Sequence, residues 1–137
     1  MDQSNVRAVC ELKLASGQDT YVAPAAYTVA EAAYEPDGWL RAIYLGDQPV
    51  GVLYAEGDKL VRLMVDSDHQ RQGIGRAAIP LVADELRRAR GLSQLYTSYV
   101  DGPADPRGFY LSLGFEDTGR RDDDGERVLA MTLGSEP

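Results

Sequence analysis

Two glycines one residue apart, Gly73 and Gly75, lie between a branched apolar run and an amphipathic one. The run before them covers residues 60–65, and the run after them ends at Gly91. Small residues let the backbone approach a phosphate closely. Successive N–H groups at a helix start point into one concavity, where the positive end of the helix dipole adds to them. This order of strand, glycine loop and helix predicts an anion-binding site.

Two other phosphate-binding loops do not fit these residues. The dinucleotide fingerprint needs a third glycine, which is missing, and it follows a parallel rather than an antiparallel strand arrangement. The nucleoside-triphosphate loop needs Gly-Lys followed by Ser or Thr, whereas Arg76 and Ala77 follow Gly75. From the residues alone, glycines that merely cap or pack the helix are the alternative to an anion site.

The elements before the loop are predicted as two short helices and three strands. Apolar spacing predicts a helix over residues 5–14, with Ser4 or Asn5 as its N-cap. Thr28 and Glu31 match a capping box, which predicts a second helix over residues 28–34. Three strand-like runs separated by turn formers then favour an antiparallel meander over residues 39–45, 50–55 and 60–65.

After the loop, apolar residues recur at helical spacing from Ile74 until Gly91. Pro80 inside this helix predicts a kink or a local bulge, because proline removes a backbone hydrogen bond. A strand is expected over residues 95–100, a helix over 106–113, and a hairpin over 115–119 and 127–133. The result is a mixed α/β sheet whose strand–loop–helix–strand unit favours a parallel pair at the anion loop.

Two turns in this second half are predicted from residue type. Asp105 is expected to cap the helix over residues 106–113, with Pro106 as its first helical residue. The Asp124-Gly125 pair is a typical hairpin turn. Both turns fix where the following element begins.

Composition limits the class of partner. A length of 137 residues fits one domain over residues 1–137. The net charge of −8, from 22 acidic and 14 basic residues, argues against nucleic acid and suits cationic small molecules such as polyamines. A single cysteine, Cys10, excludes an internal disulfide, and no secretory or membrane-length apolar run is present. We therefore expect a cytoplasmic protein with no membrane partner.

Two segments resemble the signatures of the GNAT superfamily of N-acetyltransferases. Residues 70–77, Gln-Arg-Gln-Gly-Ile-Gly-Arg-Ala, are similar to its acyl-CoA pyrophosphate loop, and residues 109–115, Phe-Tyr-Leu-Ser-Leu-Gly-Phe, are similar to its second signature. Residues 21–24, 30–32 and 41–44 further resemble the bacterial diamine and spermine/spermidine branch. The resemblance implies an antiparallel meander, then a strand–pyrophosphate loop–helix–strand unit, and a C-terminal hairpin.

Two departures from the family pattern matter. Family members usually begin with a strand before the first helix, whereas only residues 1–4 precede the helix expected here. Either the sheet lacks that strand or a second subunit, as in a homodimer, covers the open edge. Before the last helix, Gly102-Pro103 stands where the family commonly has asparagine, which puts one cofactor contact in doubt.

The resemblance implies direct transfer of an acetyl group from acetyl-CoA to an amine, without a metal. Backbone groups of Met64 and Val65 would then pair with the pantetheine arm. Backbone N–H groups would hold the pyrophosphate, and they come from Arg71, Gln72, Gly73, Ile74, Gly75 and Arg76. The two arginine side chains either add charge-assisted phosphate contacts or stay solvated.

Tyr110, in the second signature, is the residue expected to act as general acid. The leaving thiolate needs a proton, and a phenol with a pKa of about 10 stays protonated at neutral pH. Its alternative role is that of a core aromatic beside Phe109.

The general base is less defined by the sequence. A primary amine has a pKa of about 10.4, so a carboxylate or an ordered water must take its proton. No acidic residue lies in residues 60–65. The candidates for contact with the acceptor are Glu31 and Glu35, with Tyr34, Trp39 and Tyr54 as walls. His69 is interpreted as a loop or solvent-exposed residue and Cys10 as a buried small hydrophobe.

Either acid could instead hold the far ammonium of a diamine, because a carboxylate placed away from the reacting amine does not hinder its deprotonation. The leading hypothesis is therefore an N-acetyltransferase for a small cationic amine such as a polyamine. The alternatives are an antibiotic or protein amine as acceptor, or a catalytically silent acyl-CoA-binding module.

Overall fold

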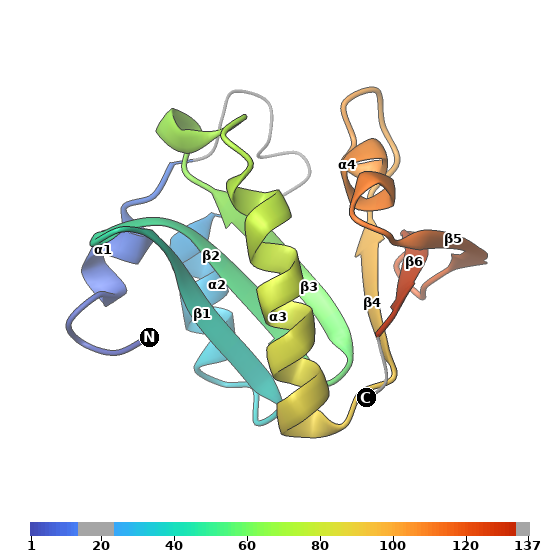
Figure 1. Ribbon diagram of the computed structural model, residues 1–137, viewed down its shortest axis with the longest axis horizontal. Coiled ribbons are helices and arrows are strands. Elements are labelled where there is room, and N and C mark those ends of the chain that lie inside the picture. Colours follow the sequence, from blue (N-terminus) through green and yellow to red (C-terminus); the bar gives the residue numbers. More distant parts are fainter. Residues whose placement is uncertain (14–23, 134–137) are drawn as a thin grey trace. The chain divides into compact units, whose positions relative to one another are not determined.

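The computed structural model describes residues 1–13 and 24–133 (Figure 1). They fall into two compact units, one within residues 1–75 and one within residues 76–137, and each is described by itself. Leu14, predicted at the end of the first helix, lies outside the described residues. So do Tyr21, Val22 and Ala23, which contribute to the resemblance to the diamine branch.

Three strands form the sheet of residues 1–75. They are β1 (Gly38–Leu45), β2 (Gln48–Glu56) and β3 (Lys59–Val65). β2 pairs antiparallel with both neighbours, which confirms the predicted meander. Among the described residues of this unit, β1 pairs only with β2, and no strand precedes the first helix. β1 is therefore an edge strand among the described residues of this unit, as expected for a sheet without the usual first strand.

Two helices pack on one face of these strands, α1 (Val6–Cys10) and α2 (Ala25–Ala32). Their buried residues Val9 and Ala25 form a core cluster with Val52 and Met64 of the sheet. α1 ends at Cys10 and is therefore shorter than the predicted helix over residues 5–14. Cys10 was predicted to be buried, and it is half-buried.

The predicted N-cap position of α1 is confirmed, but the side chain there does not cap the helix. Asn5 occupies the N-cap position, but its side chain makes no capping hydrogen bond. Its Oδ1 accepts from the N–H of Asp2, and its Nδ2 donates to the Tyr44 hydroxyl at 3.1 Å. The amide is thus used to join the N-terminal turn to β1.

The predicted capping box at Thr28 is also wrong. α2 already begins at Ala25, after Pro24, and it ends at Ala32, before Tyr34. Proline suits a helix start because its fixed φ and missing N–H cost nothing there. Thr28 is buried inside the helix, and its hydroxyl donates to the Pro24 carbonyl at 3.4 Å.

The unit of residues 76–137 begins in the first turn of α3 (Ile74–Arg90). The helix continues through Pro80 without interruption, and the kink predicted there stays a prediction. Gly91 follows with φ +65°, which confirms the predicted stop. Among the helices of residues 1–13 and 24–133, none is long and apolar enough to span a lipid bilayer.

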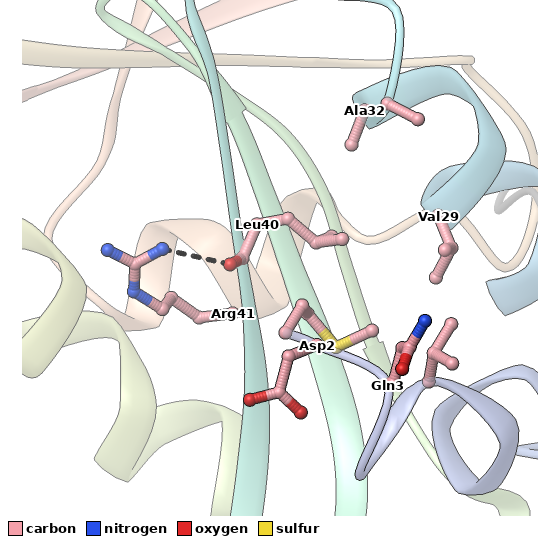
Figure 2. A pocket seen from close by; sticks show the side chains of 9 residues that line it. Asp2, Gln3, Val29, Ala32, Leu40 and Arg41 are labelled. Carbon is pink, nitrogen blue, oxygen red and sulfur yellow. Dashed lines mark hydrogen bonds between the residues drawn. The ribbon is translucent and has the colours of Figure 1, made fainter.

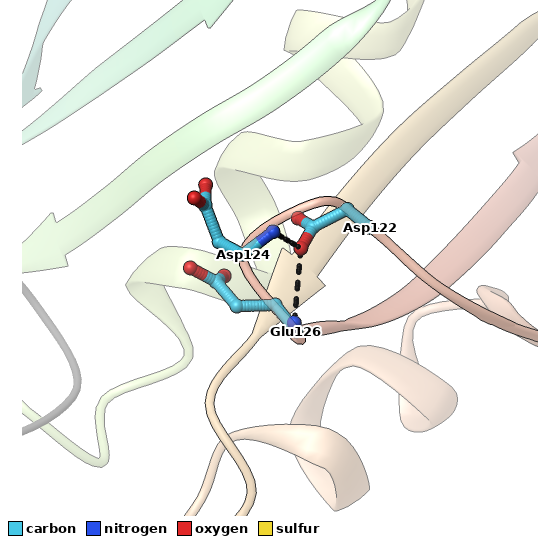
Figure 3. Close-up of side chains that lie close together, drawn as sticks. All are labelled: Asp122, Asp124 and Glu126. Atoms are coloured by element: carbon cyan, nitrogen blue, oxygen red, sulfur yellow. Dashed lines mark hydrogen bonds between the residues drawn. The ribbon is translucent and has the colours of Figure 1, made fainter.

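The strands of the second unit are β4 (Gln94–Tyr99), β5 (Glu116–Arg121) and β6 (Arg127–Thr132). β6 lies between the other two and pairs antiparallel with both. The predicted β5–β6 hairpin is confirmed. Figure 3 shows its tip, where the Asp122 carboxylate accepts hydrogen bonds from the N–H groups of Asp124 and Glu126.

Helix α4 (Arg107–Ser112) starts one step later than predicted, because Pro106 is its N-cap and not its first residue. Asp105 still serves the helix start, since its Oδ1 accepts from the Arg107 N–H at 3.0 Å. Its Oδ2 accepts from the N–H of Gly102 at 3.1 Å. One carboxylate thus orders the turn on both sides.

Candidate active site

The glycine loop has the backbone geometry of an anion site. β3 ends at Val65, a single 3₁₀ turn covers Ser67–His69, and α3 begins at Ile74. Between them Arg71 has φ +63° and Gly73 has φ +77°. Alternation of left-handed and ordinary residues makes successive N–H groups converge. Arg71 is the one non-glycine at positive φ among the described residues, and such strain is concentrated at functional sites.

Two side chains hold this loop, and one of them bonds to the strand before it. Gln70 Nε2 donates to the Val65 carbonyl at 3.1 Å. The Asp66 carboxylate accepts from the Lys13 N–H at 2.8 Å, and it lies 3.3 Å from His69 Nδ1. Burial alone would raise the pKa of Asp66, but these hydrogen bonds outweigh it and hold the pKa below its ordinary value. His69 is therefore a loop residue held by Asp66, as expected.

Met64 and Val65, the predicted pantetheine residues, are the last two of β3. In the β2–β3 ladder they pair with Val52 and Gly51. A Cβ on Gly51 would lie 2.5 Å from the Met64 carbonyl oxygen, so only glycine fits there. The strand end that precedes the loop is thus closely packed against β2.

The second unit joins Arg76 to the second signature. Arg76 Nη2 donates to Ser112 Oγ on α4 at 3.2 Å, and that hydroxyl donates to the Phe109 carbonyl at 2.6 Å. Two segments that were recognised separately in the sequence are therefore connected by side chains. Whether Arg76 also contacts phosphate stays a prediction.

Tyr110 is a buried aromatic, 8% exposed, on α4. Its ring centroid lies 5.6 Å from that of Phe109 and 5.5 Å from that of Phe115. Burial raises the pKa of Tyr110, and a hydrogen bond with the Thr97 side chain offsets part of the increase. The phenol is therefore protonated at neutral pH, which is the form that a general acid requires.

Glu31, predicted as an acceptor residue, is held by a partner that the sequence analysis missed. Its carboxylate pairs with Arg62 of β3, with Nη1 to Oε1 at 2.9 Å and Nη2 to Oε2 at 3.5 Å. The Arg62 guanidinium also lies 5.2 Å from the centroid of the Tyr27 ring. The signal in the sequence was a single arginine within the otherwise apolar run of residues 60–65.

The other predicted acceptor residues have different surroundings. Tyr54 is fully buried, and its hydroxyl donates to Glu56 at 2.5 Å. Its pKa is raised by burial first, then by the Glu56 hydrogen bond and charge, and also by the charges of Glu31 and Glu35. Tyr54 is therefore a neutral core residue that is bonded to Glu56 and feels the charges of Glu31 and Glu35.

The other two predicted wall residues, Tyr34 and Trp39, differ from Tyr54 in their surroundings. Tyr34 is 89% exposed. Trp39 is buried, with the Arg41 guanidinium 4.5 Å from its ring centroid. A role for these two aromatic residues as walls of the acceptor site stays a prediction.

A hollow of about 480 Å³ lies between the N-terminal segment, α2 and β1 (Figure 2). Figure 2 shows Arg41 beside it, donating to the Leu40 carbonyl at 3.0 Å. None of the predicted acceptor residues lines this hollow. Its lining is mostly apolar and consists of Met1, Asp2, Gln3, Val6, Val29, Ala32, Ala33, Leu40 and Arg41.

Comparison with known proteins gives a family match. The acetyltransferase (GNAT) domain family matches residues 24–117. The chain is 36% identical over 78 residues to the peptidyl-lysine N-acetyltransferase YjaB of Salmonella typhimurium, which covers 57% of this chain and 50% of that protein. It is 42% identical over 80 residues to the ribosomal protein bS18-alanine N-acetyltransferase of Escherichia coli K12. This match covers 54% of this chain and 53% of that protein. The matched part is about half the length of these curated relatives.

Solved structures share the fold. An aminoglycoside 6'-N-acetyltransferase complexed with coenzyme A superposes with a TM-score of 0.73 at 18% identity, covering 99% of this chain and 94% of that one. The Escherichia coli ribosomal-protein-S18-alanine N-acetyltransferase superposes with a TM-score of 0.69 at 19% identity, covering 100% and 93%. The predicted mixed α/β fold is confirmed, whereas these similarities do not single out the polyamine branch. Because the family match covers more than half of the chain, the protein belongs to the GNAT acetyltransferase family.

Proposed function

We propose that this protein is an acetyl-CoA-dependent N-acetyltransferase that acts as one domain over residues 1–137. The observation that carries the proposal is the left-handed backbone of Arg71 and Gly73 between β3 and α3, in a chain of this family. A protein of the same fold was solved with coenzyme A, which supports the choice of cosubstrate. A cytoplasmic location stays a prediction from the sequence.

The residues fit the cosubstrate by chemical type. Backbone N–H groups from Arg71 to Arg76 would hold the pyrophosphate, because converging N–H donors at a helix start suit a diphosphate. Met64 and Val65 would bind the pantetheine arm through their backbone. Acetyl-CoA supplies an activated acetyl thioester.

Tyr110 would then protonate the leaving sulfur. Its burial keeps the phenol neutral, so the proton is available over the whole physiological pH range. The acceptor amine must lose its own proton first, which costs about 4 to 5 kcal/mol at pH 7 for a pKa of about 10.4. The proposed general base is Glu35, which would take that proton directly or through a water molecule. Glu31 is less suitable because it is already paired with Arg62.

The proposed acceptor is an amine of a cationic molecule. Sequence relatives named for a peptidyl lysine and for an alanine of ribosomal protein bS18 favour a protein amine. The net charge of −8 suits a polyamine or an aminoglycoside equally well, and these are the second candidates.

The test is a thiol-release assay with acetyl-CoA and four acceptors: an alanine-terminated peptide, a lysine peptide, an aminoglycoside and spermidine. We expect release of CoA with at least one of them, and calorimetric binding of CoA by the protein alone. Binding without turnover on any amine would replace the enzyme by a silent acyl-CoA-binding module. Failure to bind CoA would contradict the assignment of the loop itself.

A further inference from the structure

Arg62 lies in β3 at a position where an apolar side chain would be expected. In the β2–β3 ladder Arg62 pairs with Tyr54 and Met64 pairs with Val52 two residues away, so Arg62 lies on the same face of β3 as the buried Met64. Its side chain is only 20% exposed. A charge in such a place is costly unless it is paired, and an apolar pair is often as stable. Stability alone therefore does not explain this arginine.

The pairing leaves part of the guanidinium available. Guanidinium has five N–H donors, and the Glu31 carboxylate takes two of them. Glu31 is 31% exposed, and Tyr27, whose ring lies under the guanidinium, is an exposed residue. The cluster of Arg62, Glu31 and Tyr27 thus presents hydrogen-bond donors to solvent while its net charge is near zero.

Such a cluster discriminates between acceptor classes. A protonated polyamine carries only donors and positive charge, so Arg62 repels it and Glu31 is already neutralised. A peptide carries carbonyl oxygens next to its amine, and these can accept from the guanidinium. Arg62 lies two residues before Met64 on one face of β3, a distance of about 7 Å, which is within reach of one peptide group.

We propose that Arg62, oriented by Glu31, is a specificity residue that binds a carbonyl oxygen of a peptide acceptor and disfavours polyamines. The inference rests on the proposed function, because it concerns the acceptor of the same reaction. It assigns Glu31 to positioning Arg62 rather than to holding an ammonium.

The test compares kcat/KM for the alanine or lysine peptide with kcat/KM for spermidine in wild type and variants. In Arg62→Gln we expect the peptide value to fall about tenfold, as for loss of one charge-assisted hydrogen bond, and the spermidine value to rise. The rise should disappear in the double variant Arg62→Gln/Glu31→Gln, because no unpaired carboxylate is left. CoA affinity should stay at the wild-type value in all of them.

The matched control is Arg87→Gln on α3. Arg87 is 19% exposed and pairs with Asp84 at 2.7 Å, so it resembles Arg62 in burial and pairing. It should leave the acceptor preference unchanged. If Arg62→Gln fails to fold, Arg62→Lys serves instead, and it should keep the poor spermidine value while losing part of the peptide rate.

Two results would overturn the inference. An unchanged peptide-to-spermidine ratio in the folded Arg62 variants overturns it alone, as does a wild-type protein that prefers spermidine. No turnover with any acceptor would overturn the proposed function as well.

Discussion

The side-chain amide of Gln70 donates a hydrogen bond to the main-chain carbonyl of Val65 at 3.1 Å. The bond encloses the 3₁₀ turn at Ser67–His69 and joins the start of the glycine loop to the end of β3. The two backbone segments proposed to bind CoA, one for the pantetheine and one for the pyrophosphate, are therefore held in a fixed spacing by one side chain.

Replacing Gln70 by alanine should weaken CoA binding about fivefold, because a net hydrogen bond contributes about 1 kcal/mol. Calorimetry with CoA measures the change. Gln48→Ala, at an exposed site at the start of β2, is the control and should bind like wild type. Equal affinity of the Gln70 variant and wild type would mean that the loop holds its position without this bond.

Gly73 tests whether the left-handed backbone matters for binding as well as for stability. Its φ is +77°, and a Cβ would meet no atom within 4 Å, so Gly73→Ala is opposed by backbone strain and not by a clash. The expected loss of stability is about 1 kcal/mol. Because the strained loop would also shift, CoA affinity should fall.

Gly57, in the β2–β3 turn, is the matched glycine. It has φ +56° and equally open surroundings, so Gly57→Ala carries the same backbone cost away from the loop. Urea unfolding should show similar losses for both variants, whereas only the Gly73 variant should lose CoA affinity. Parallel losses of affinity in both would show a general effect of instability.

Features that depend on neighbouring residues could be predicted from the sequence. The meander follows from alternating apolar runs with turn formers between them, and the β5–β6 hairpin follows from Asp124-Gly125. The glycine loop was recognised in the same way. Its strained residue Arg71 was not, because nothing in its chemistry indicates a positive φ.

Features that depend on distant residues could not be predicted. Thr28 and Glu31 satisfy the capping-box pattern, but burial of Thr28 and the start at Pro24 place both residues inside α2. Glu31 is then free to pair with Arg62, which lies 31 residues further along the chain. A pattern of near neighbours contains no information about such a partner.

Asp66 should make the stability of the loop region dependent on pH. Its pKa in the folded protein is below the ordinary value of 3.8, since the Lys13 N–H and His69 bonds outweigh burial. The unfolded chain therefore binds a proton more readily. Stability from this carboxylate is complete above about pH 5 and is lost as the pH falls through 3.8 toward the folded value.

Asp66→Asn should thus cost about 1 to 3 kcal/mol at pH 7, because a charged acceptor is removed from the Lys13 N–H. Urea unfolding at pH 7 and at pH 3 measures the difference, which should shrink at pH 3. The control Asp58→Asn, at an exposed site in the β2–β3 turn, should show no change at either pH. A loss of equal size at both pH values would contradict the role of the ionised carboxylate.

Tyr110→Phe separates catalysis from packing at the second signature. The phenylalanine ring keeps the contacts with Phe109 and Phe115 and loses only the hydroxyl. Turnover should fall by about a hundredfold or more, while CoA affinity stays unchanged, because the acid acts only on the leaving sulfur. Tyr96→Phe, whose hydroxyl bonds to Gln94 near the surface, is the control and should keep wild-type turnover.

The pH profile supplies an independent reading of the same residue. A general acid must be protonated, so activity falls as the pH rises through its pKa, and burial places that pKa above the ordinary value of 10.0. Ionisation of Tyr110 should therefore not lower the wild-type kcat at any pH below 10. At higher pH the wild-type kcat should decline, and this decline should be absent from the residual activity of Tyr110→Phe. Unchanged turnover in the variant, with the same alkaline decline as wild type, would leave Tyr110 as a core aromatic and assign the proton to another group.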